Sequence, residues 1–327
     1  MPAPHMRVLV VTNIYPTSGS PARGSFVVSQ VAALRRTGQV EVDVAAFDAA
    51  GKPWRYASEV VRNALHRRDA DLVHAHYGLS GPAALAAAGR RPVVLTVHGR
   101  DCHHPVVKRI TAFAAARADA VVAVSRELAA ICAFPTTDVI PVGVDLERFH
   151  PIPRDVARLA LGIPPDQRVI IFPAAPARRE KRFDRAECLA AAVPGLRLVV
   201  MEGRPHEEVP LWHNAADAVV VTSEREGYGL ACMEALACDV PVLSTPVGVA
   251  REVLSAVPGT LCAPFDVAVW GAHLRRLLAD PDPRVPGRMV AETQSTDVMA
   301  RRLLALYREV LGNRRDAAGR RRVRASR

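Results

Sequence analysis

Cysteine and long apolar runs are scarce in this 327-residue chain. Its six cysteines are scattered and none forms a C-x-x-C pair, a pattern typical of reduced thiols in a cytosolic enzyme and not of a disulfide framework or a zinc site. No apolar run reaches the roughly 18 residues of a membrane-spanning helix. The N-terminus also lacks the apolar segment and cleavage site of a signal peptide. The sequence therefore predicts a cytoplasmic protein.

Positive charge is in excess but unevenly placed. The formal net charge is +10, and residues 314–327 carry +6 of it, as seven arginines against one aspartate. We expect residues 313–327 to form a disordered basic tail, and contact of this tail with an anionic inner-membrane surface stays open. Aromatic residues make up only 5% of the chain and no nucleic-acid-binding signature is present, so nucleic acid is not an expected partner.

Short apolar segments alternate with helical patterns through the first half of the chain. Continuous apolar strands separated by helices are typical of a parallel sheet covered on both faces. The predicted strands are Arg7–Thr12, Val40–Phe47, Asp71–Ala75, Pro92–Val97 and Asp119–Val124. The turn after the first strand lacks G-x-G-x-x-G, which disfavours a dehydrogenase.

The same alternation restarts after Phe149–Pro153, whose two prolines predict a linker. Strands are expected at Arg168–Phe172, Leu196–Met201, Ala218–Thr222 and Pro241–Ser244. We therefore predict an α/β protein of two Rossmann-like domains, residues 1–150 and 151–295, that face a central cleft. A C-terminal helix is expected at 296–312, and its return to the first domain is one alternative.

A glycine turn between two glutamates is the most informative local pattern. Glu226-Gly227-Tyr228-Gly229 follows a predicted strand and opens a helix that contains Glu234. Backbone N–H groups at such a junction bind anions such as a diphosphate. Eight residues span about 12 Å of helix, whereas the carboxyl groups of a retaining hydrolase lie about 5–5.5 Å apart. The two glutamates therefore fit clamps on hydroxyl groups better than an acid and a nucleophile, with two unrelated structural glutamates as the plain alternative.

The segment EGYGLACMEALACDVPVLSTPVG resembles the signature of the family-4 retaining glycosyltransferases, which have the GT-B fold. Further segments resemble the family in order and spacing, so that the similarity spans most of the chain. They are Asp71–Tyr77, Thr96–Asp101, Ala120–Ser125, Ile140–Phe149 and Ala215–Ser223. The resemblance implies an enzyme that transfers a hexosyl-type sugar from a UDP- or GDP-sugar to a hydroxyl group, with retention of configuration.

The resemblance also implies roles for residues of the second half. Glu234 is expected to hold the donor ribose, Glu226 to face the donor sugar, and Lys181 to neutralise the leaving diphosphate. A solvated cation is the plain alternative for Lys181. The residues whose backbone is expected to meet the diphosphate or the sugar are Gly227, Tyr228, Gly229 and Leu230.

In the first half, the resemblance implies that Gly24 approaches the donor phosphate and that His98 hydrogen-bonds a hydroxyl of the reacting sugar. Asp101 is expected to orient a loop. A bare helix start at Gly24 and a structural histidine at His98 are the plain alternatives.

The chain departs from the family pattern around the phosphate site. Many members carry an arginine five residues before the lysine, where this chain has Pro176, and Arg178 is the candidate substitute. The stretch from Lys181 to Gly203 is also short. The loop that borders the nucleobase in many members therefore has no clear counterpart near Gly203–His206.

The resemblance implies no metal ion or other cofactor beyond the nucleotide-sugar substrate. His74, His76, His103 and His104 have no obvious acidic partner, so a metal site is not expected there. The acceptor stays open between a lipid-linked sugar, a polysaccharide end and a small metabolite. Two other classes also stay open: a nucleotide-sugar epimerase of GT-B fold, and a catalytically silent sugar-nucleotide-binding protein.

Overall fold

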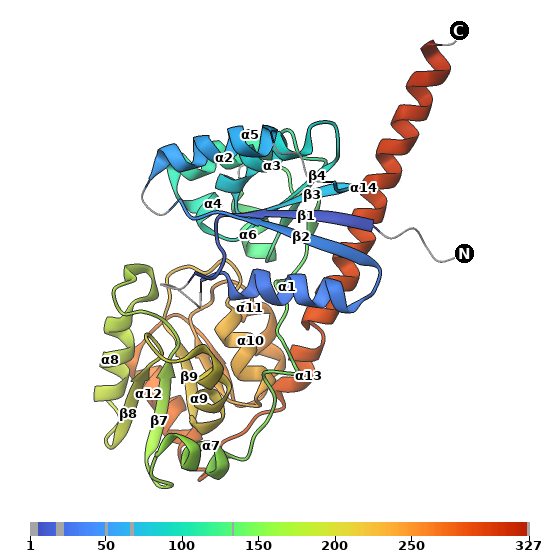
Figure 1. The fold of residues 1–327 in the computed structure, drawn as a ribbon. Helices are drawn as coiled ribbons and strands as arrows, with labels where there is room; N and C mark the ends of the chain where they lie inside the picture. Colours follow the sequence, from blue (N-terminus) through green and yellow to red (C-terminus); the bar gives the residue numbers. More distant parts are fainter. Residues whose placement is uncertain (1–5, 18–22, 50–51, 66–68, 133, 326–327) are drawn as a thin grey trace. The chain divides into compact units, whose positions relative to one another are not determined.

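The computed structural model describes residues 6–17, 23–49, 52–65, 69–132 and 134–325 (Figure 1). The chain forms two compact units, one of residues 1–142 with 296–327 and one of residues 143–295. Each unit is built on its own parallel sheet, which confirms the predicted α/β class. No described helix is long and apolar enough to cross a membrane.

The first sheet has six parallel strands in the order β2-β1-β3-β4-β5-β6. They are β1 (Met6–Thr12), β2 (Val40–Ala46), β3 (Leu72–His76), β4 (Val93–Val97), β5 (Ala120–Ala123) and β6 (Asp138–Val139). Every residue of β3, β4 and β5 is buried, as expected for continuous apolar strands between two helical layers. Since all strands are parallel, their carboxyl ends share one edge.

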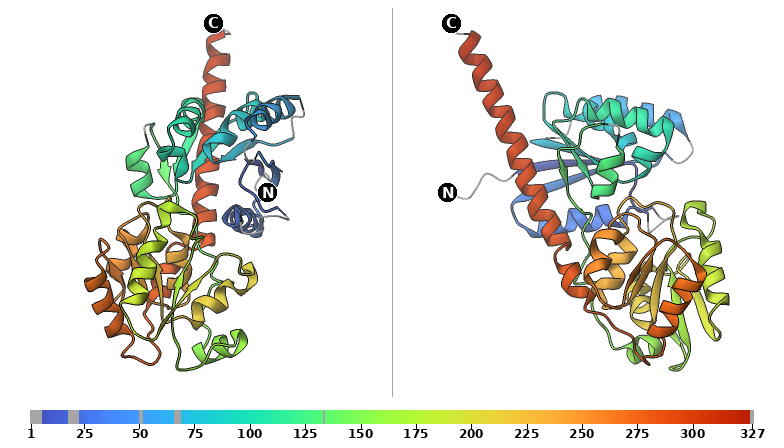
Figure 2. Two further views of the ribbon diagram at one scale, coloured as in Figure 1. Left: turned by 90° about the vertical axis from the view of Figure 1, so that its left-hand side faces the viewer. Right: turned by 180° about the vertical axis from the view of Figure 1, so that it is seen from behind.

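Helices cover both faces of this sheet (Figures 1 and 2). α1 (Ser25–Arg36) and α14 (Thr296–Ala325) pack together on one face, where Leu303, Leu304 and Tyr307 of α14 join the core. α3 (Gly81–Ala88) lies on the sheet between α2 (Pro53–Leu65) and α5 (Pro105–Ala115). The short elements η1 (Gly78–Ser80), α4 (Arg100–His103) and α6 (Arg126–Ile131) follow β3, β4 and β5.

The C-terminal helix is longer than the sequence predicts. α14 continues to Ala325, into the segment for which a disordered tail is expected. Arg314 donates to Asp119 in the first unit, with 2.6 Å between Nε and Oδ1, and arginine and alanine are strong helix formers. The prediction of a disordered tail rested on a charge count, which includes neither the Arg314–Asp119 ion pair nor helix propensity.

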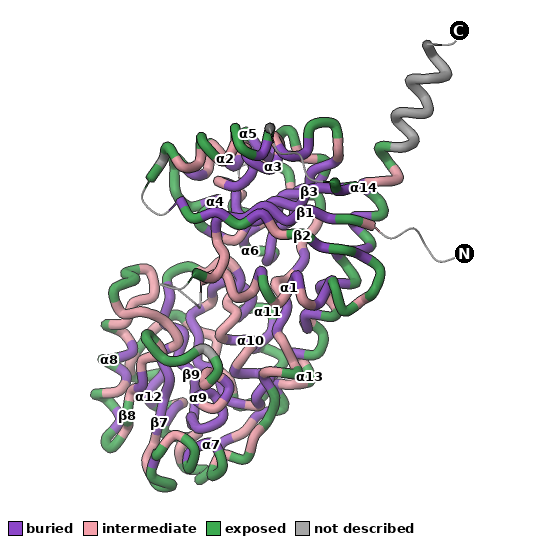
Figure 3. The backbone as a smooth tube through the Cα atoms, in the orientation of Figure 1, coloured by how far each residue is buried: buried purple, intermediate pink, exposed green. Residues whose placement is uncertain are grey.

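The second sheet has five parallel strands in the order β11-β10-β9-β7-β8. They are β7 (Arg168–Phe172), β8 (Leu196–Val200), β9 (Ala218–Val221), β10 (Val242–Ser244) and β11 (Leu261–Cys262). The fully buried Trp270 and Leu274 of α12 (Val267–Leu277) pack on one face beside α8 (Phe183–Ala191). The burial of the central strands is visible in Figure 3.

The remaining helices of the second unit complete its two layers. α10 (Leu230–Ala237) contacts β9 and β10 and packs beside α9 and α13. The others are α7 (Arg154–Leu161), α9 (Val209–Ala215), α11 (Ala250–Val253), α13 (Gly287–Glu292), η2 (Arg179–Lys181), η3 (His206–Glu208) and η4 (Leu254–Ala256).

The predicted linker Phe149–Pro153 is part of the second unit, because the chain changes unit between residues 142 and 143. Phe149 is 3% exposed, and Arg288 donates to its carbonyl oxygen at 3.1 Å. Val144 pairs with the returning chain, since its N–H donates to the carbonyl of Gln294 at 3.0 Å. The two prolines therefore mark the entry into α7 and not a free connection.

The expectation that all cysteines are reduced is wrong for one pair. Cys102 of α4 and Cys132 at the end of α6 form a disulfide, with their Cα atoms 5.1 Å apart. Because β4 and β5 are parallel neighbours, the short helices that follow them begin at the same edge. Their cysteines are 30 residues apart, a spacing that carries no sequence signature.

Asp217 is a fully buried carboxylate that anchors the start of β9 in the second unit. It accepts hydrogen bonds from the backbone N–H of Val169 at 2.6 Å, from Arg154 at 2.7 Å and from Arg158 at 3.1 Å. Arg158 is itself only 1% exposed. The network therefore neutralises a buried arginine as well as a buried aspartate.

We expect Asp217→Asn to lower the free energy of unfolding of the second unit by about 3–5 kcal/mol, because it leaves a buried guanidinium without its counter-charge. Denaturant unfolding followed by tryptophan fluorescence measures this, since Trp212 and Trp270 both lie in the second unit. Asp155→Asn, on the exposed side of α7, is the matched control. Equal losses in the two variants would contradict the assignment.

Candidate functional site

Lys181 and Glu226 form an ion pair at the carboxyl edge of the second sheet. Lys181 Nζ lies 2.6 Å from Oε1 and 2.7 Å from Oε2 of Glu226, and each side chain is 13% exposed. Lys181 follows β7 and Glu226 follows β9, and these two strands are parallel neighbours. Open α/β sheets bind their ligands at this edge. The structure thus brings together two residues that the sequence analysis singled out separately.

Two hydroxyl groups that sequence reasoning missed hold this pair. Ser223 donates to Glu226 Oε1 at 2.7 Å. Thr222 donates to the carbonyl oxygens of Lys181 at 2.9 Å and Arg182 at 3.0 Å. Both hydroxyl residues directly follow β9, so their position at the end of a buried strand was the available signal.

The glycine turn depends on a second glycine loop. Gly229 has a φ of 100° and forms the N-cap of α10. Gly248 has a φ of 57°, and a Cβ on it would lie 2.3 Å from the carbonyl oxygen of Tyr228, so only glycine fits. The next residue, Val249, donates its N–H to that same carbonyl at 2.7 Å. The backbone of the loop after β10 therefore shapes the predicted anion-binding turn.

Tyr228 does not expose its side chain at this turn. The ring is 5% exposed and its hydroxyl donates to Gln294 at 2.8 Å. The burial of the ring is compatible with the prediction for Tyr228, which concerned its backbone alone.

Glu234 lies one turn into α10, beside a histidine that sequence reasoning missed. Its Oε2 is 3.8 Å from Nε2 of His213 on α9, and its side chain is 16% exposed. His213 is 1% exposed, and its Nδ1 has no hydrogen-bond partner among the described residues. The carboxylate of Glu234 is thus partly accessible and backed by a buried imidazole.

Arg178 contacts Lys181 through the backbone alone, since its carbonyl oxygen accepts the N–H of Lys181 at 2.8 Å. Its guanidinium donates to Glu180 Oε1, at 2.8 Å from Nη2, and its side chain is 56% exposed. The neighbouring Arg182, with a φ of 53°, pairs with Glu224. Arg178 can therefore take the place of the family arginine only after its guanidinium leaves Glu180.

His98 follows β4 at the carboxyl edge of the first sheet. Its Nε2 lies 3.1 Å from Nδ1 of His76, and Nε2 of His76 lies 2.8 Å from the amide nitrogen of Gln30. The ring of Phe26 on α1 also lies next to that of His98, with 4.8 Å between the ring centroids. Burial, and then the neighbouring His76, lowers the pKa of His98 well below its usual range, so the half-buried imidazole is neutral.

Gly24 begins α1 at the same edge. Its φ is 69°, and a Cβ there would lie 2.1 Å from the carbonyl oxygen of Ile14, which follows β1. Glycine is therefore required by the close approach of two backbone segments.

Asp101 orients the loop that carries His98, as expected. Its fully buried carboxylate accepts the backbone N–H groups of Gly78, His98 and Gly99, with 2.6 Å to that of His98. Burial raises the pKa of Asp101 to about 6, and these hydrogen bonds oppose the shift. The loops after β3 and β4 are thereby tied to one side chain.

His74 and His104 of the first unit have structural partners. His74 hydrogen-bonds Tyr307 through Nδ1 at 2.6 Å and Thr96 through Nε2 at 2.7 Å. His104 forms the N-cap of α5. Among the described residues, no three side chains of the histidine, cysteine, aspartate and glutamate types are grouped so as to hold a metal ion.

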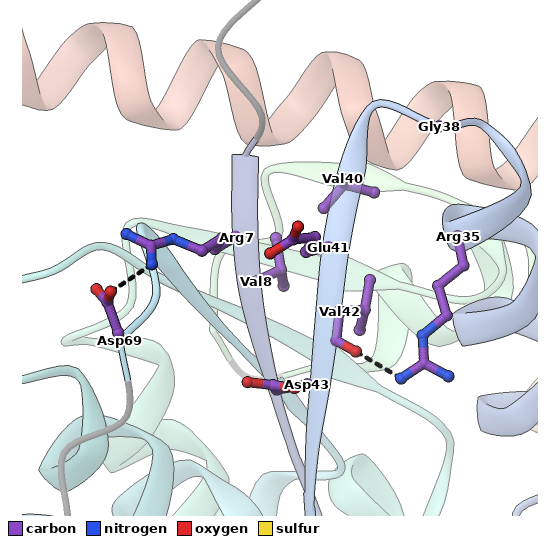
Figure 4. A pocket seen from close by; sticks show the side chains of 9 residues that line it. All are labelled: Arg7, Val8, Arg35, Gly38, Val40, Glu41, Val42, Asp43 and Asp69. Carbon is purple, nitrogen blue, oxygen red and sulfur yellow. Dashed lines mark hydrogen bonds and ion pairs between the residues drawn. The ribbon is translucent and has the colours of Figure 1, made fainter.

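A hollow beside β1 and β2 lies at the opposite edge from these residues (Figure 4). Its lining includes Arg7 and Val8 at the start of β1 and Val40 at the start of β2. Parallel sheets place ligands at the carboxyl ends of the strands, so this hollow is not the candidate site.

Comparison with known protein families assigns both halves of the chain. Residues 7–148 match Glycosyltransferase Family 4, and residues 162–294 match Glycosyl transferases group 1. The chain belongs to the family-4 glycosyltransferases. D-inositol 3-phosphate glycosyltransferases of Mycobacterium tuberculosis and Mycobacterium bovis are 33% identical to it in an alignment that covers 54% of this chain. The match spans 44% of the length of these curated relatives.

Solved structures show that this family-4 chain has the GT-B fold. Sucrose-phosphate synthase from Thermosynechococcus elongatus superposes with a TM-score of 0.81 at 19% identity, over 94% of this chain and 100% of that one. Anabaena HepE in complex with UDP-glucose gives 0.71 at 18% identity, over 93% of this chain and 100% of that one.

We expect unfolding at pH 5.5 to take up protons at His74, because burial lowers its pKa well below the usual value of about 6.5. A lowered pKa stabilises the folded state above about pH 6.5, and this contribution is lost as the pH falls. Unfolding of the His74→Gln variant at pH 5.5 should therefore take up about one proton fewer than unfolding of the unsubstituted protein.

The pH slope of the free energy of unfolding measures this uptake. Tyr307→Phe is the control, since it removes a partner of His74 but keeps the imidazole. An uptake that His74→Gln leaves unchanged would show that His74 is charged in the folded protein.

Proposed function

We propose that the chain is a retaining glycosyltransferase that moves a hexosyl-type sugar from a UDP- or GDP-sugar to a hydroxyl acceptor. The observation that carries the proposal is the Lys181–Glu226 pair beside the glycine turn of the second unit. A cation and backbone N–H groups are suited to a diphosphate, and a carboxylate is suited to sugar hydroxyls. The UDP-glucose complex of HepE, which shares the fold, supports this kind of donor.

Donor binding requires the ion pair to exchange partners. In the free protein, Lys181 occupies both carboxylate oxygens of Glu226. A diphosphate competes for the ammonium group, and the released carboxylate then accepts hydrogen bonds from hydroxyls of the donor sugar. Ser223 remains able to hold Glu226 during the exchange. During the exchange, neither the Glu226 carboxylate nor the Lys181 ammonium group is therefore left without a partner at a site that is only partly open to water.

Charge stabilisation carries the chemistry of the proposed reaction. The bond between C1 of the sugar and the diphosphate oxygen breaks, and negative charge grows on the diphosphate beside Lys181 and the turn. The acceptor oxygen forms the new bond to C1 on the same face, and its proton passes to the departing phosphate oxygen. Glu234 holds the ribose and His98 hydrogen-bonds a hydroxyl of the transferred sugar. This route uses no metal ion, and the basic groups take its place.

The acceptor is a lipid-linked sugar, a polysaccharide end or a small metabolite. An epimerase of the same fold would instead release an epimer of the donor without any acceptor. A silent protein would bind the nucleotide sugar without turnover. Incubation with UDP- and GDP-sugars and an acceptor panel, read by mass spectrometry, distinguishes the three.

We expect Lys181→Ala and Glu226→Gln each to lower kcat about 100-fold or more, as loss of one preorganised charge-stabilising group does. Glu234→Gln should mainly raise KM for the donor, because the ribose is bound equally in the ground and transition states. Glu187→Gln, an exposed position on α8, is the control and should retain activity. Full transfer by both Lys181→Ala and Glu226→Gln would refute the site.

We also propose that the protein works in the cytoplasm against an anionic membrane face. On α2, Trp54 is 63% and Val61 58% exposed. On α5, Val106 is 60% and Phe113 49% exposed, and Arg117 lies over the Phe113 ring at 3.9 Å. Both helices pack against α3, and exposed apolar side chains among basic ones suit the surface of an anionic bilayer.

We expect the full chain to float with phosphatidylserine-containing vesicles and not with purely neutral ones. The double variant Trp54→Ser/Phe113→Ser should weaken this binding, and truncation of residues 315–327 tests the contribution of the basic tail. Leu159→Ser, at an 84% exposed apolar position of the second unit, is the control. Equal binding to neutral and anionic vesicles would refute the proposal.

A further inference from the structure

Gln30 and His76 form a line of hydrogen bonds that leads to His98, and no part of the proposed mechanism uses these two residues. Gln30 comes from α1, His76 from the end of β3, and His98 from the residue after β4. The Gln30 amide nitrogen lies 2.8 Å from Nε2 of His76, and Nδ1 of His76 lies 3.1 Å from Nε2 of His98. A residue of α1 and the residue after β4 therefore both hydrogen-bond the imidazole of His76, at the end of β3.

Both hydrogen bonds of this line are donated in the same direction, from Gln30 to His76 and from His76 to His98. An amide nitrogen only donates, so Nε2 of His76 accepts and the neutral His76 carries its proton on Nδ1. That proton is donated to Nε2 of His98, so the neutral His98 carries its own proton on Nδ1. Among the described residues of the first unit, none hydrogen-bonds to Nδ1 of His98.

Burial keeps this direction stable. His76 is fully buried and Gln30 is 5% exposed, so water does not replace either partner. Burial lowers the pKa of His76 to about 3, which keeps that imidazole neutral at every physiological pH. A neutral ring has one donor and one acceptor, and the amide decides which nitrogen is which.

We infer that Gln30 and His76 are positioning residues that hold His98 as the Nδ1–H tautomer, so that it presents a hydrogen-bond donor to an oxygen of the transferred sugar. The inference rests on the proposed function for the identity of that oxygen. A donor at this position favours sugars that place a hydroxyl oxygen there, so the line also contributes to donor choice.

Two-bond ¹H–¹⁵N correlation spectra of the ¹⁵N-histidine-labelled full chain at pH 7.5 read the tautomer directly, and His98→Asn assigns the signal. We expect Nδ1–H for His98 in the unsubstituted protein and a mixture of tautomers in Gln30→Leu. Tyr307→Phe removes a similarly buried hydrogen bond, from the neighbouring His74, and should leave the His98 signal unchanged. An Nε2–H signal for His98 in the unsubstituted protein overturns the inference.

Kinetic measurements distinguish a positioning role of His76 from a role in packing alone. His76→Leu removes the donor to His98 and should lower kcat/KM for transfer about tenfold, the factor for loss of about 1.4 kcal/mol of hydrogen bonding. His76→Asn keeps an N–H donor at the δ position and should recover most of this loss. Equal losses in the two folded variants, checked by their unfolding transitions, overturn the inference.

The two proposals fail in different ways. Sugar transfer by a protein whose His98 carries its proton on Nε2 overturns the positioning role alone. An Nδ1–H signal in a protein that transfers no sugar from any UDP- or GDP-donor overturns the proposed function, while the direction of the hydrogen-bond line stands.

Discussion

Parallel strand pairing is the constraint on which both units depend. Because every strand in each sheet points the same way, every carboxyl end reaches one edge. The residues that follow those strands then meet without being close in sequence. Lys181 and Glu226 meet in this way across β7 and β9, and His76 and His98 across β3 and β4.

At the carboxyl edge of its sheet, the second unit carries a charged pair of side chains and the first unit carries neutral histidines. In the second unit, a lysine and a glutamate of opposite charge form an ion pair in which each side chain is 13% exposed. In the first unit, burial lowers the pKa of both His76 and His98, so these two imidazoles are neutral and act through the direction of their hydrogen bonds. In the proposed mechanism, the charged pair binds the diphosphate and the neutral donor discriminates among hydroxyl groups.

Backbone geometry matters as much as side chains at both edges. Gly24 and Gly248 each stand where a Cβ would collide with a carbonyl oxygen, at 2.1 and 2.3 Å. Both glycines let one loop approach another closely, and each approach places a helix start or a turn at the edge of a sheet. Asp101 has a comparable effect, since one buried carboxylate ties the loops after β3 and β4 together.

The sequence by itself determined the alternation of strands and helices, the glycine turn at Glu226 and the candidate lysine at position 181, because periodicity and local motifs depend on neighbouring residues. The tertiary structure decided the unit boundary near Val144, the Cys102–Cys132 disulfide, and the contacts of Ser223 and Gln30. The predicted linker at Phe149–Pro153 and the uniformly reduced cysteines were wrong for the same reason. Such contacts join elements far apart in the chain, and they depend on strand order and on which helix covers which face, which local patterns do not encode.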